Sequence, residues 1–202
     1  MERSRKEGTT VHGALSAALV LAGRQVIYRE WKENLVRILS PVDTRKLLGI
    51  VDNFTLTFTT GQVSVEPRGN TDFWELARFM KSGLSGSQTH EGASFPLELL
   101  TTVVNGLDIQ SAAQLELHAF KAEAMLSNLG NVRYDTTFGK LKLEALWGPS
   151  VLRGFEDDQT IGVATANGSL CLLHTTFNPQ PPLLEVMEQV LTTACATEAS
   201  ST

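Results

Sequence analysis

The sequence is poor in the features that mark many specialised protein classes. It has 2 cysteines, Cys171 and Cys195, which excludes a disulfide framework, a CxxC motif and a zinc set. Both are expected to act as small buried apolar side chains. No apolar run approaches the ~18 residues of a membrane span, and the apolar run 14–22 is not followed by the small-residue cleavage site of a signal peptide. These absences predict a soluble, cytoplasmic protein.

Basic residues are also scarce, with 17 Lys and Arg against 22 Asp and Glu and a net charge of −5. Nucleic-acid surfaces need clustered cations, so no nucleic-acid partner is expected. The one basic cluster, residues 1–6, alternates in sign and predicts a flexible tail over 1–8. A second flexible tail is expected over 196–202. The apolar fraction of 42% can fill a core, and a single domain over 9–195 is predicted.

Common catalytic motifs are missing as well: there is no Walker loop, GxGxxG, HExxH or GxSxG. The 4 histidines are dispersed along the chain, at His12, His90, His118 and His174. His12 is interpreted as a core or boundary residue of a helix, and His90 as a solvated loop residue. His174 lies in a predicted strand, where a local hydrogen-bond partner is expected. Glu156, Asp157 and Asp158 form an acidic turn without a third ligand element, so no metal site is predicted.

The first half of the chain predicts a mixture of helices and strands. An almost wholly apolar helix is expected from Thr9 or Thr10 to about Arg24, followed by a strand over 33–40. In the next strand Phe54, Leu56 and Phe58 alternate with threonines and are expected to face the core. Val63 and Val65 continue this strand beyond a bend or bulge at Gly61.

Helical patterns follow. Asp72 with Glu75 three residues later is a capping box, and Ala77 and Met80 lie on the apolar face of the helix it begins. Residues 82–92 are rich in Gly and Ser and predict a flexible loop. A helix is expected to start at Ser94 or Pro96 and to end at Gly106, with a weaker helix over 111–121.

The last third is rich in strand patterns, near 123–127, 141–148, 160–166 and 169–177. Asn167-Gly168 predicts the type I′ turn of a tight hairpin between the last two strands. Pro181-Pro182 opens a final amphipathic helix. Because helices and strands are interleaved without strict alternation, the predicted class is α+β: a two-layer α/β sandwich with a mixed sheet covered by helices.

Seven segments, taken in order, resemble the C-terminal half of the condensation-domain and chloramphenicol-acetyltransferase-like superfamily, with standalone polyketide- or alcohol-acylating acyltransferases the most similar. They are TTVHGALSAALVLA, ILSPVDTR, DNFTLTFTT, DFWELARFMKSGL, MLSNLGNV, LKLEALWGPS and IGVATANGSLCLLHTTF. The similarity runs from about Thr9 to Leu191. It implies one lobe of the chloramphenicol acetyltransferase-like fold and a place in polyketide or lipid secondary metabolism.

The resemblance implies a reaction in which an acyl group moves from a thioester, on coenzyme A or a carrier protein, to a hydroxyl or amine. The family catalyst is the second histidine of an HHxxxDG motif in a first lobe, and it acts as general base. This sequence has no adjacent histidine pair. We therefore expect no catalytic residue in this chain, an active site that is incomplete, and no transfer by the isolated chain. The alternative is a catalytically silent binding module or a gene fragment derived from such an enzyme.

The resemblance also implies partners. A first lobe or partner subunit is required, a carrier protein can deliver the donor, and the uncovered lobe is expected to self-associate. No bound cofactor is expected; acyl-coenzyme A or acyl-phosphopantetheine enters as substrate.

Three residues carry the implied site. Ser127 and Asn128 end a strand and match the polar pair that lines the family's tunnel, where they can position the thioester or donate to an oxyanion. The alternative is a strand-ending turn, since Ser, Asn and Gly favour turns. Arg45 matches the arginine that pairs with the first lobe's motif aspartate; its alternative is a local pair with Asp43. Trp147 is interpreted as a core residue.

Overall fold

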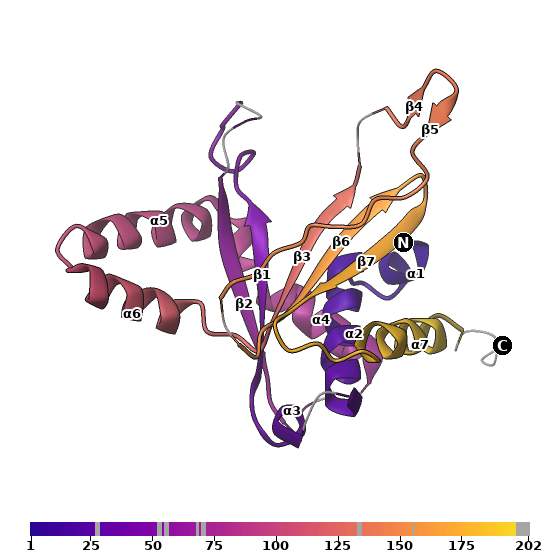
Figure 1. The fold of residues 1–202 in the computed structure, drawn as a ribbon, viewed down its shortest axis with the longest axis horizontal. Coiled ribbons are helices and arrows are strands. Elements are labelled where there is room, and N and C mark those ends of the chain that lie inside the picture. Colours follow the sequence, from indigo (N-terminus) through magenta and orange to yellow (C-terminus); the bar gives the residue numbers. More distant parts are fainter. Residues whose placement is uncertain are drawn as a thin grey trace.

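The computed structural model describes residues 1–26, 29–51, 54, 57–67, 69, 72–132, 135–154 and 156–196. Its centre is a five-stranded mixed sheet in the order β2-β1-β3-β6-β7 (Figure 1). The strands are β1 Val36–Asp43, β2 Phe58–Val65, β3 Ala124–Asn131, β6 Gln159–Ala166 and β7 Ser169–Thr175. β1 runs parallel to β3 and β3 parallel to β6, while β2 and β7 are antiparallel to their neighbours. The short strands β4 Thr137–Phe138 and β5 Leu141–Lys142 form a separate hairpin arm.

Helices cover one face of the sheet. They are α1 Glu2–Lys6, α2 Val11–Val26, α3 Arg29–Glu33, α4 Phe73–Gly83, the 3₁₀ turn η1 Gly86–Gln88, α5 His90–Val104, α6 Ile109–Ala119 and α7 Leu183–Ala196. α2 lies between α4 and α7 against the sheet, whereas α5 and α6 extend away from it (Figure 1). The fold is therefore the predicted α+β sandwich, with one face of the sheet left without helices.

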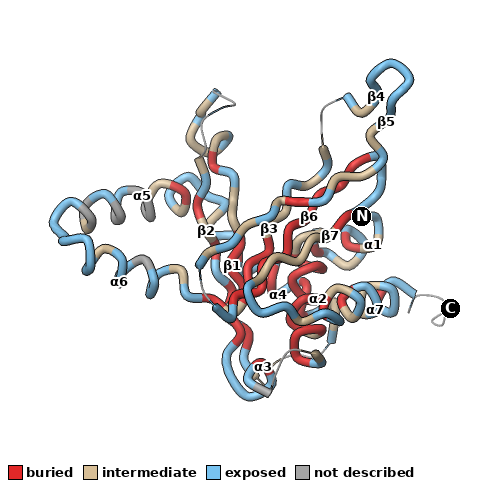
Figure 2. Tube along the Cα trace, viewed as in Figure 1, coloured by how far each residue is buried: buried red, intermediate tan, exposed pale blue. Residues whose placement is uncertain are grey.

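The core forms around α2. Nearly every residue of this helix from Gly13 to Arg24 is buried (Figure 2). Small side chains let neighbours approach closely: a Cβ on Gly13 would lie 2.6 Å from the Ala77 carbonyl oxygen of α4. Thr9, just before α2, donates a hydrogen bond to the same carbonyl at 2.7 Å. Because α2 contributes apolar surface all round, it can bury the sheet, α4 and α7 against one another.

Several local predictions are confirmed. Asp72 caps α4, its carboxylate accepting a hydrogen bond from the Glu75 N–H at 2.8 Å. Asn167 and Gly168 have φ of 48° and 81°, as a type I′ turn requires. Helices form where the periodicity indicated them, including α2, α6 and α7.

The prediction for β2 is wrong in register. β2 begins at Phe58 and runs through Gly61 without a bend, so the core-facing residues are Thr59, Gly61, Val63 and Val65. Phe58 faces outward and Phe54 is 98% exposed; Leu56 lies outside the described residues. Leu84 and Ser87 pack against the backbone of Gly61, where a built Cβ would lie 2.6 Å from a Leu84 methyl group.

Three other segments differ from expectation. Residues 1–8, predicted as a tail, include α1, which is tied to α4 by Arg78–Glu7 and by the Lys81 ammonium donating to the Gly8 carbonyl. The predicted loop 82–92 contains η1 and the first turn of α5, which Thr89 caps by accepting from the Gly92 N–H. Of the expected strand 141–148, only Leu141–Lys142 pairs, and residues 143–153 form a strap across the open face of the sheet (Figure 1).

The strap is held at both ends. At its start the Asn167 side chain donates to the Leu143 carbonyl and accepts from the Thr136 hydroxyl, which fixes the base of the β4–β5 arm. At its centre Pro149 lies directly on β6, where a Cβ on Gly162 would fall 1.9 Å from the Pro149 oxygen. Ser150 and Thr175 join their hydroxyls at 3.2 Å. The open face is thus covered by extended chain rather than by a helix.

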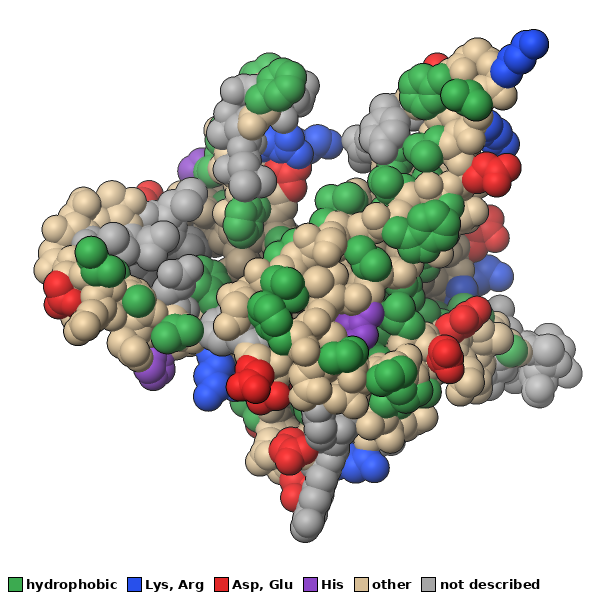
Figure 3. All heavy atoms as spheres, viewed as in Figure 1, with side chains coloured by type: hydrophobic (Ala, Val, Ile, Leu, Met, Phe, Trp, Pro, Cys, Tyr) green, Lys and Arg blue, Asp and Glu red, His purple; other side chains and the backbone are tan. Residues whose placement is uncertain are grey.

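The two halves of the sheet separate towards the carboxyl ends of β1 and β3. Their pairing is confined, among the described residues, to Ile38–Ala124 and Leu39–Met125. Beyond these pairs the strands diverge (Figure 1), and the space-filling view is hollowed between them (Figure 3). We call this hollow, between Ser40–Asp43 and Leu126–Asn128, the notch.

Gly162 provides a stability test of the strap. Gly162→Ala should lower the free energy of unfolding by about 1–3 kcal/mol, because the strap must move off β6 to admit the methyl group. Urea denaturation measures the change. Gly106→Ala is the matched control, since no atom lies within 4 Å of its built Cβ. Equal stability of G162A and the wild type would contradict the close contact.

Candidate functional site

Ser127 and Asn128 lie at the point where β3 leaves β1. In register, Ser127 is next to Gly162 of β6, and it shares the open face of the sheet with Met125. Its side chain is half-buried. Within the described part of the chain the Ser127 hydroxyl makes no hydrogen bond, so this group is available to a ligand at the mouth of the notch.

Asn128 is already engaged. Its side-chain oxygen accepts a hydrogen bond from the Gly130 N–H at 2.7 Å, and Gly130 has φ of 71°. This Asx turn coincides with a register shift between Asn128 and Asn131. The turn at Asn128 is thus a local irregularity within β3 rather than the strand end that was predicted, because β3 continues to Asn131. The amide nitrogen of Asn128 is left for other contacts.

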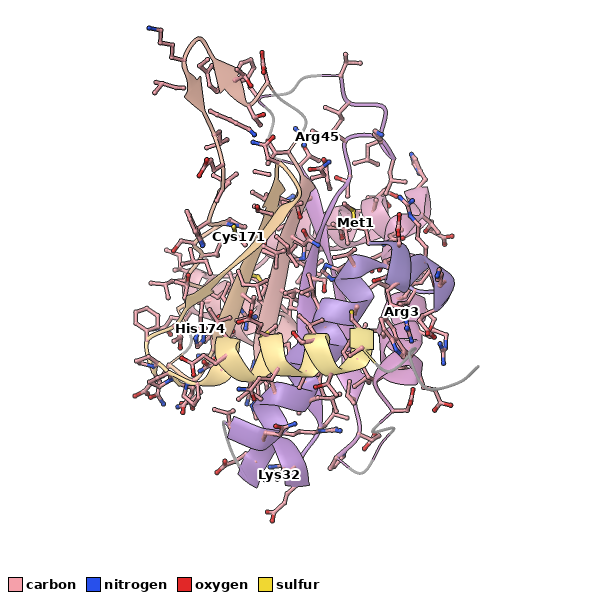
Figure 4. All side chains as sticks on the ribbon, turned by 90° about the vertical axis from the view of Figure 1, so that its right-hand side faces the viewer. Met1, Arg3, Lys32, Arg45, Cys171 and His174 are labelled. Carbon is pink, nitrogen blue, oxygen red and sulfur yellow. The ribbon has the colours of Figure 1, made fainter. Side chains whose placement is uncertain are left out.

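Arg45 follows β1 on the other side of the notch and pairs locally. Its guanidinium contacts the Asp43 carboxylate at 2.6 and 3.0 Å, in a bidentate arrangement. This pair holds the pKa of Asp43 below its usual value, chiefly through the hydrogen bond from Arg45. Figure 4 places Arg45 at one end of the molecule, opposite to Lys32. The implied pairing with a first lobe stays a prediction, and an incoming carboxylate would have to compete with Asp43.

His12 and Ser40 form a pair that resembles a nucleophile and its base but cannot act as one. The His12 Nε2 lies 2.9 Å from the Ser40 hydroxyl oxygen, which joins α2 to β1. Ser40 is 1% exposed and faces the helices, so no substrate can reach it. Burial lowers the pKa of His12 from 6.5 to about 4, which keeps the ring neutral. His12 is therefore a structural residue at the helix–sheet boundary, as predicted.

The other histidines are also accounted for. His174 on β7 has the local partner that was predicted, Gln159, at 2.8 Å from Nε2 to Oε1. Burial lowers the pKa of His174, and the Asp158 charge opposes this shift. His118 is exposed on α6 with its Nδ1 2.8 Å from the Gln114 carbonyl oxygen, and His90 is exposed at the start of α5.

A buried ion pair, Arg153–Asp158, anchors the end of the strap and was not predicted. Arg153 contacts the Asp158 carboxylate and donates to the Phe120 and Ala122 carbonyls at 2.8 and 3.1 Å. Asp158 also accepts from the Thr160 hydroxyl at 3.0 Å. Asp158, which ends the predicted acidic turn, is 5% exposed. Nothing in the sequence marks this pair, because its carbonyl acceptors are more than 30 residues from Arg153.

A cavity lies at the end of the sheet opposite to the notch. It has a volume of about 690 Å³ and is bordered by the beginnings of β1, β3 and β6. Its lining includes Glu30, Lys121, Glu123, Glu156, Asp157 and Asp158. Glu123 is paired with Arg37 at 2.5 Å and Asp158 with Arg153. Since ligands of open α/β sheets bind at the carboxyl ends of parallel strands, the notch is the better candidate site.

Two absences apply to the residues that the structure describes. No group of three His, Cys, Asp or Glu side chains could hold a metal ion there. None of the helices in the described ranges is both long and apolar enough to cross a bilayer.

A half-open mixed sheet, helices on one face and a polar pair on β3 beside a notch define one lobe of a chloramphenicol acetyltransferase-like fold. The comparison with protein families supports this class. The model of the phthiocerol/phthiodiolone dimycocerosyl transferase C-terminus family matches residues 1–160. The chain belongs to that family, and it corresponds to the C-terminal half of a condensation-domain or chloramphenicol-acetyltransferase-like acyltransferase.

Solved structures share the fold. Polyketide synthase associated protein 5 from Mycobacterium tuberculosis superposes with a TM-score of 0.60 and 16% identity over 98% of this chain. The condensation domain for chain release from the enacyloxin polyketide synthase gives a TM-score of 0.54 and 12% identity over 98% of this chain. The epimerization domain from the third module of tyrocidine synthetase B gives a TM-score of 0.51 and 16% identity over 93% of this chain. The chain spans only 48%, 38% and 41% of those chains, respectively. No curated protein matches the sequence.

His12 generates a prediction on pH. An unfolded chain protonates this ring below pH 6.5, but the folded chain does so only near pH 4. The unfolded state therefore binds more protons in this window, and the free energy of unfolding should fall by roughly 3 kcal/mol as the pH drops through it. His12→Gln should flatten the dependence, measured by urea denaturation at several pH values. His174 adds a loss of the same sign, which persists in H12Q.

The exposed His118 supplies the control for this experiment, so His118→Gln should keep the wild-type dependence. If H12Q were to lose stability with acid as steeply as the wild type, the buried neutral ring would not be the cause.

Proposed function

We propose that this chain is the acceptor-side lobe of an acyltransferase, which moves an acyl group from a coenzyme A or carrier-protein thioester to a hydroxyl or amine. The observation that carries this proposal is the free Ser127 hydroxyl at the notch, in a lobe that belongs to an acyltransferase family. A hydroxyl in that position can donate to the oxyanion that forms on the thioester carbon. Asn128 supports the same region through its turn and its free amide nitrogen.

The proposal requires a first lobe that supplies the general base. Among the described residues, the half-buried His12 and His174 are each held by a polar partner, and neither lies at the notch. Exposed apolar side chains favour a covering partner; they include Leu129, Phe138 and Leu141. Trp147, which was predicted to lie in the core, is also exposed, so that prediction is wrong. Figure 3 shows hydrophobic side chains across the face that the strap crosses and at the end of the β4–β5 arm. Patches of this kind mark interfaces, so the lobe alone is expected to self-associate.

Arg45 is proposed to contact that first lobe. A carboxylate of the first lobe would replace Asp43 on this guanidinium, which already holds a carboxylate in a bidentate arrangement. The donor enters as substrate, and no resident cofactor is proposed.

A second candidate function is a silent binding module. The local Asp43–Arg45 pair favours it, because the arginine is satisfied without any partner. The two functions predict different results when a first lobe is restored: the acyltransferase lobe would then support acyl transfer, and the silent module would not.

The isolated chain should transfer no acyl group, since no described histidine is placed to take a proton from an acceptor. Incubation with several acyl-coenzyme A donors and alcohols should give the uncatalysed rate. Fusion to, or mixing with, the first lobe of a related acyltransferase should raise the rate above it. If the chain alone transferred an acyl group, and His12→Gln or His174→Gln abolished that transfer, the assignment would be overturned. If every fusion gave only the uncatalysed rate, the silent binding module would be favoured.

Ser127 and Asn128 should separate function from stability in the restored two-lobed protein. Ser127→Ala should leave the melting temperature unchanged, because the hydroxyl has no partner, and should cut the transfer rate by roughly 10²–10³-fold if it serves the oxyanion. Asn128→Ala should also cost about 1 kcal/mol of stability, because it removes the hydrogen bond to the Gly130 N–H. Thermal unfolding and initial rates give both quantities.

Ser169→Ala, at the exposed start of β7, is the matched control and should change neither quantity. Full transfer by S127A would show that its hydroxyl takes no part in the reaction.

A further inference from the structure

β7 is an edge strand whose outer side has no partner strand. It is the last strand in the order of the sheet, and Figure 1 shows no strand beyond it. The opposite edge strand, β2, differs, because α4, α5 and η1 pack against it and the Leu84 and Ser87 side chains lie on the Gly61 backbone. In the described part of the chain, the sheet thus has one edge that helices cover and one edge, β7, that is open to another strand.

The turn before β7 fixes which of its backbone groups point outward. Asn167-Gly168 is a two-residue hairpin turn, so Ala166 and Ser169 on either side of it exchange backbone hydrogen bonds. In an antiparallel ladder such pairs alternate with pairs that are not hydrogen-bonded to each other. The odd-numbered residues of β7 therefore bond to β6, and the even-numbered ones direct their N–H and C=O groups to the free edge. These residues are Leu170, Leu172 and His174. No hydrogen bond among the described residues uses these outward groups.

This edge also lacks the features that keep strand edges apart. Native edges are usually protected by charged side chains, by proline or by a covering element. From Gln159 to Leu184 the sequence contains no Asp, Glu, Lys or Arg, and β7 itself contains no proline. Leu170, at the start of the edge, is 43% exposed. A second copy of β7 would therefore meet no like charge and no missing donor, and it would cover an apolar side chain.

One register of two β7 strands satisfies every outward group. A two-fold axis at Leu172 pairs this residue with its counterpart and pairs Leu170 with His174 of the other copy. Each of these pairs exchanges two backbone hydrogen bonds, as the closely spaced pairs of an antiparallel ladder do. Any other antiparallel register leaves at least one of the three residues without a partner. The strand is therefore complementary to itself, which is the condition for a two-fold interface.

We propose that β7 is a dimerisation edge, at which two copies of this chain pair their β7 strands antiparallel about Leu172 and join their sheets into one. This is strand addition between identical chains. The helix layers of the two copies then lie on the same side of the joined sheet. Because β3 and β6 lie between β7 and the notch, the dimer leaves the notch open to a first lobe. The inference does not depend on the proposed function.

A disulfide test reads this register directly in the full chain. Cys171 would face Leu173 of the other copy in a pair that is not hydrogen-bonded, where Cα atoms are about 4.5 Å apart, a separation that a disulfide can span. Leu173→Cys in a Cys195→Ala background should therefore give a covalent dimer on air oxidation with copper phenanthroline, visible in non-reducing electrophoresis. Thr175→Cys in the same background is the matched control, since Thr175 would lie against Ser169 of the other copy, and it should crosslink at least about tenfold more slowly.

Backbone amide exchange of the wild type gives a second readout. As the protein concentration rises and sedimentation shows the dimer, the N–H groups of Leu170, Leu172 and His174 should exchange more slowly. The N–H groups of the residues between them, which bond to β6, should be protected at every concentration. Association through the exposed apolar side chains elsewhere on the lobe would not produce this alternation along β7.

Leu170→Pro should raise the dissociation constant of the dimer by about tenfold, because it removes one interface donor from each copy. The lost N–H takes no part in the β6 ladder, so the fold should be retained. Leu170→Thr, which keeps the N–H, is the matched control and should change the dissociation constant by less than about threefold. The L173C crosslink does not depend on this variant, so a folding defect in L170P leaves the test intact.

The inference is overturned if the chain stays monomeric at millimolar concentration, if T175C crosslinks as fast as L173C, or if folded L170P associates as tightly as the wild type. It is also overturned if a first lobe, added by fusion, protects the outward amides of β7 and abolishes the dimer. Acyl transfer by a fusion that never dimerises would reject this inference alone. A β7 dimer without transfer in any fusion would support it and reject the transferase role.

Discussion

The rest of the structure depends on the burial of α2. One small-residue helix packs against α4 and α7, and its residues share one hydrophobic core with β1, β3 and β6. On the β1 side the tie is the His12–Ser40 hydrogen bond; on the β6 side it is apolar packing under Ile161 and Val163. Because α2 holds the halves together from below, β1 and β3 can separate above without loss of the fold.

The open face of the sheet is covered in a different way from the helix-covered face. A strap replaces helices there, and its position is set by one buried ion pair, Arg153–Asp158, and by the absence of a side chain at Gly162. A buried pair is costly unless each member is fully hydrogen-bonded, and Arg153 meets this condition through two backbone carbonyls. The strap therefore lies close to Ser127 while leaving the notch uncovered.

The sequence predicted the parts of the fold that depend on local patterns. The α2 periodicity, the Asp72 cap and the Asn167-Gly168 turn are all short-range signals, and all three are confirmed. Phe54 and Phe58 were predicted to face the core because they alternate with threonines, but both are exposed, while Val63 and Val65, which were predicted to continue the strand, face the core. The strap, the Arg153–Asp158 pair and the notch depend on contacts between distant segments, which no local pattern records. Ser127 and Asn128 were predicted as site residues from the family resemblance. That Asn128 accepts a hydrogen bond while the Ser127 hydroxyl makes none among the described residues is seen only in the structure.

Asn167 links this architecture to chemical ageing. Its amide nitrogen is the donor that fixes the start of the strap, and its oxygen accepts from Thr136 on the other side of the arm. An asparagine followed by glycine is among the thermolabile sites of proteins, because the next backbone nitrogen can displace ammonia from the side chain. Water then opens the cyclic imide that forms, and the carboxylate so produced would be an acceptor facing the Leu143 carbonyl, with no proton to offer it. Loss of a single ammonia molecule would thus release the β4–β5 arm while the helix-covered core stayed intact.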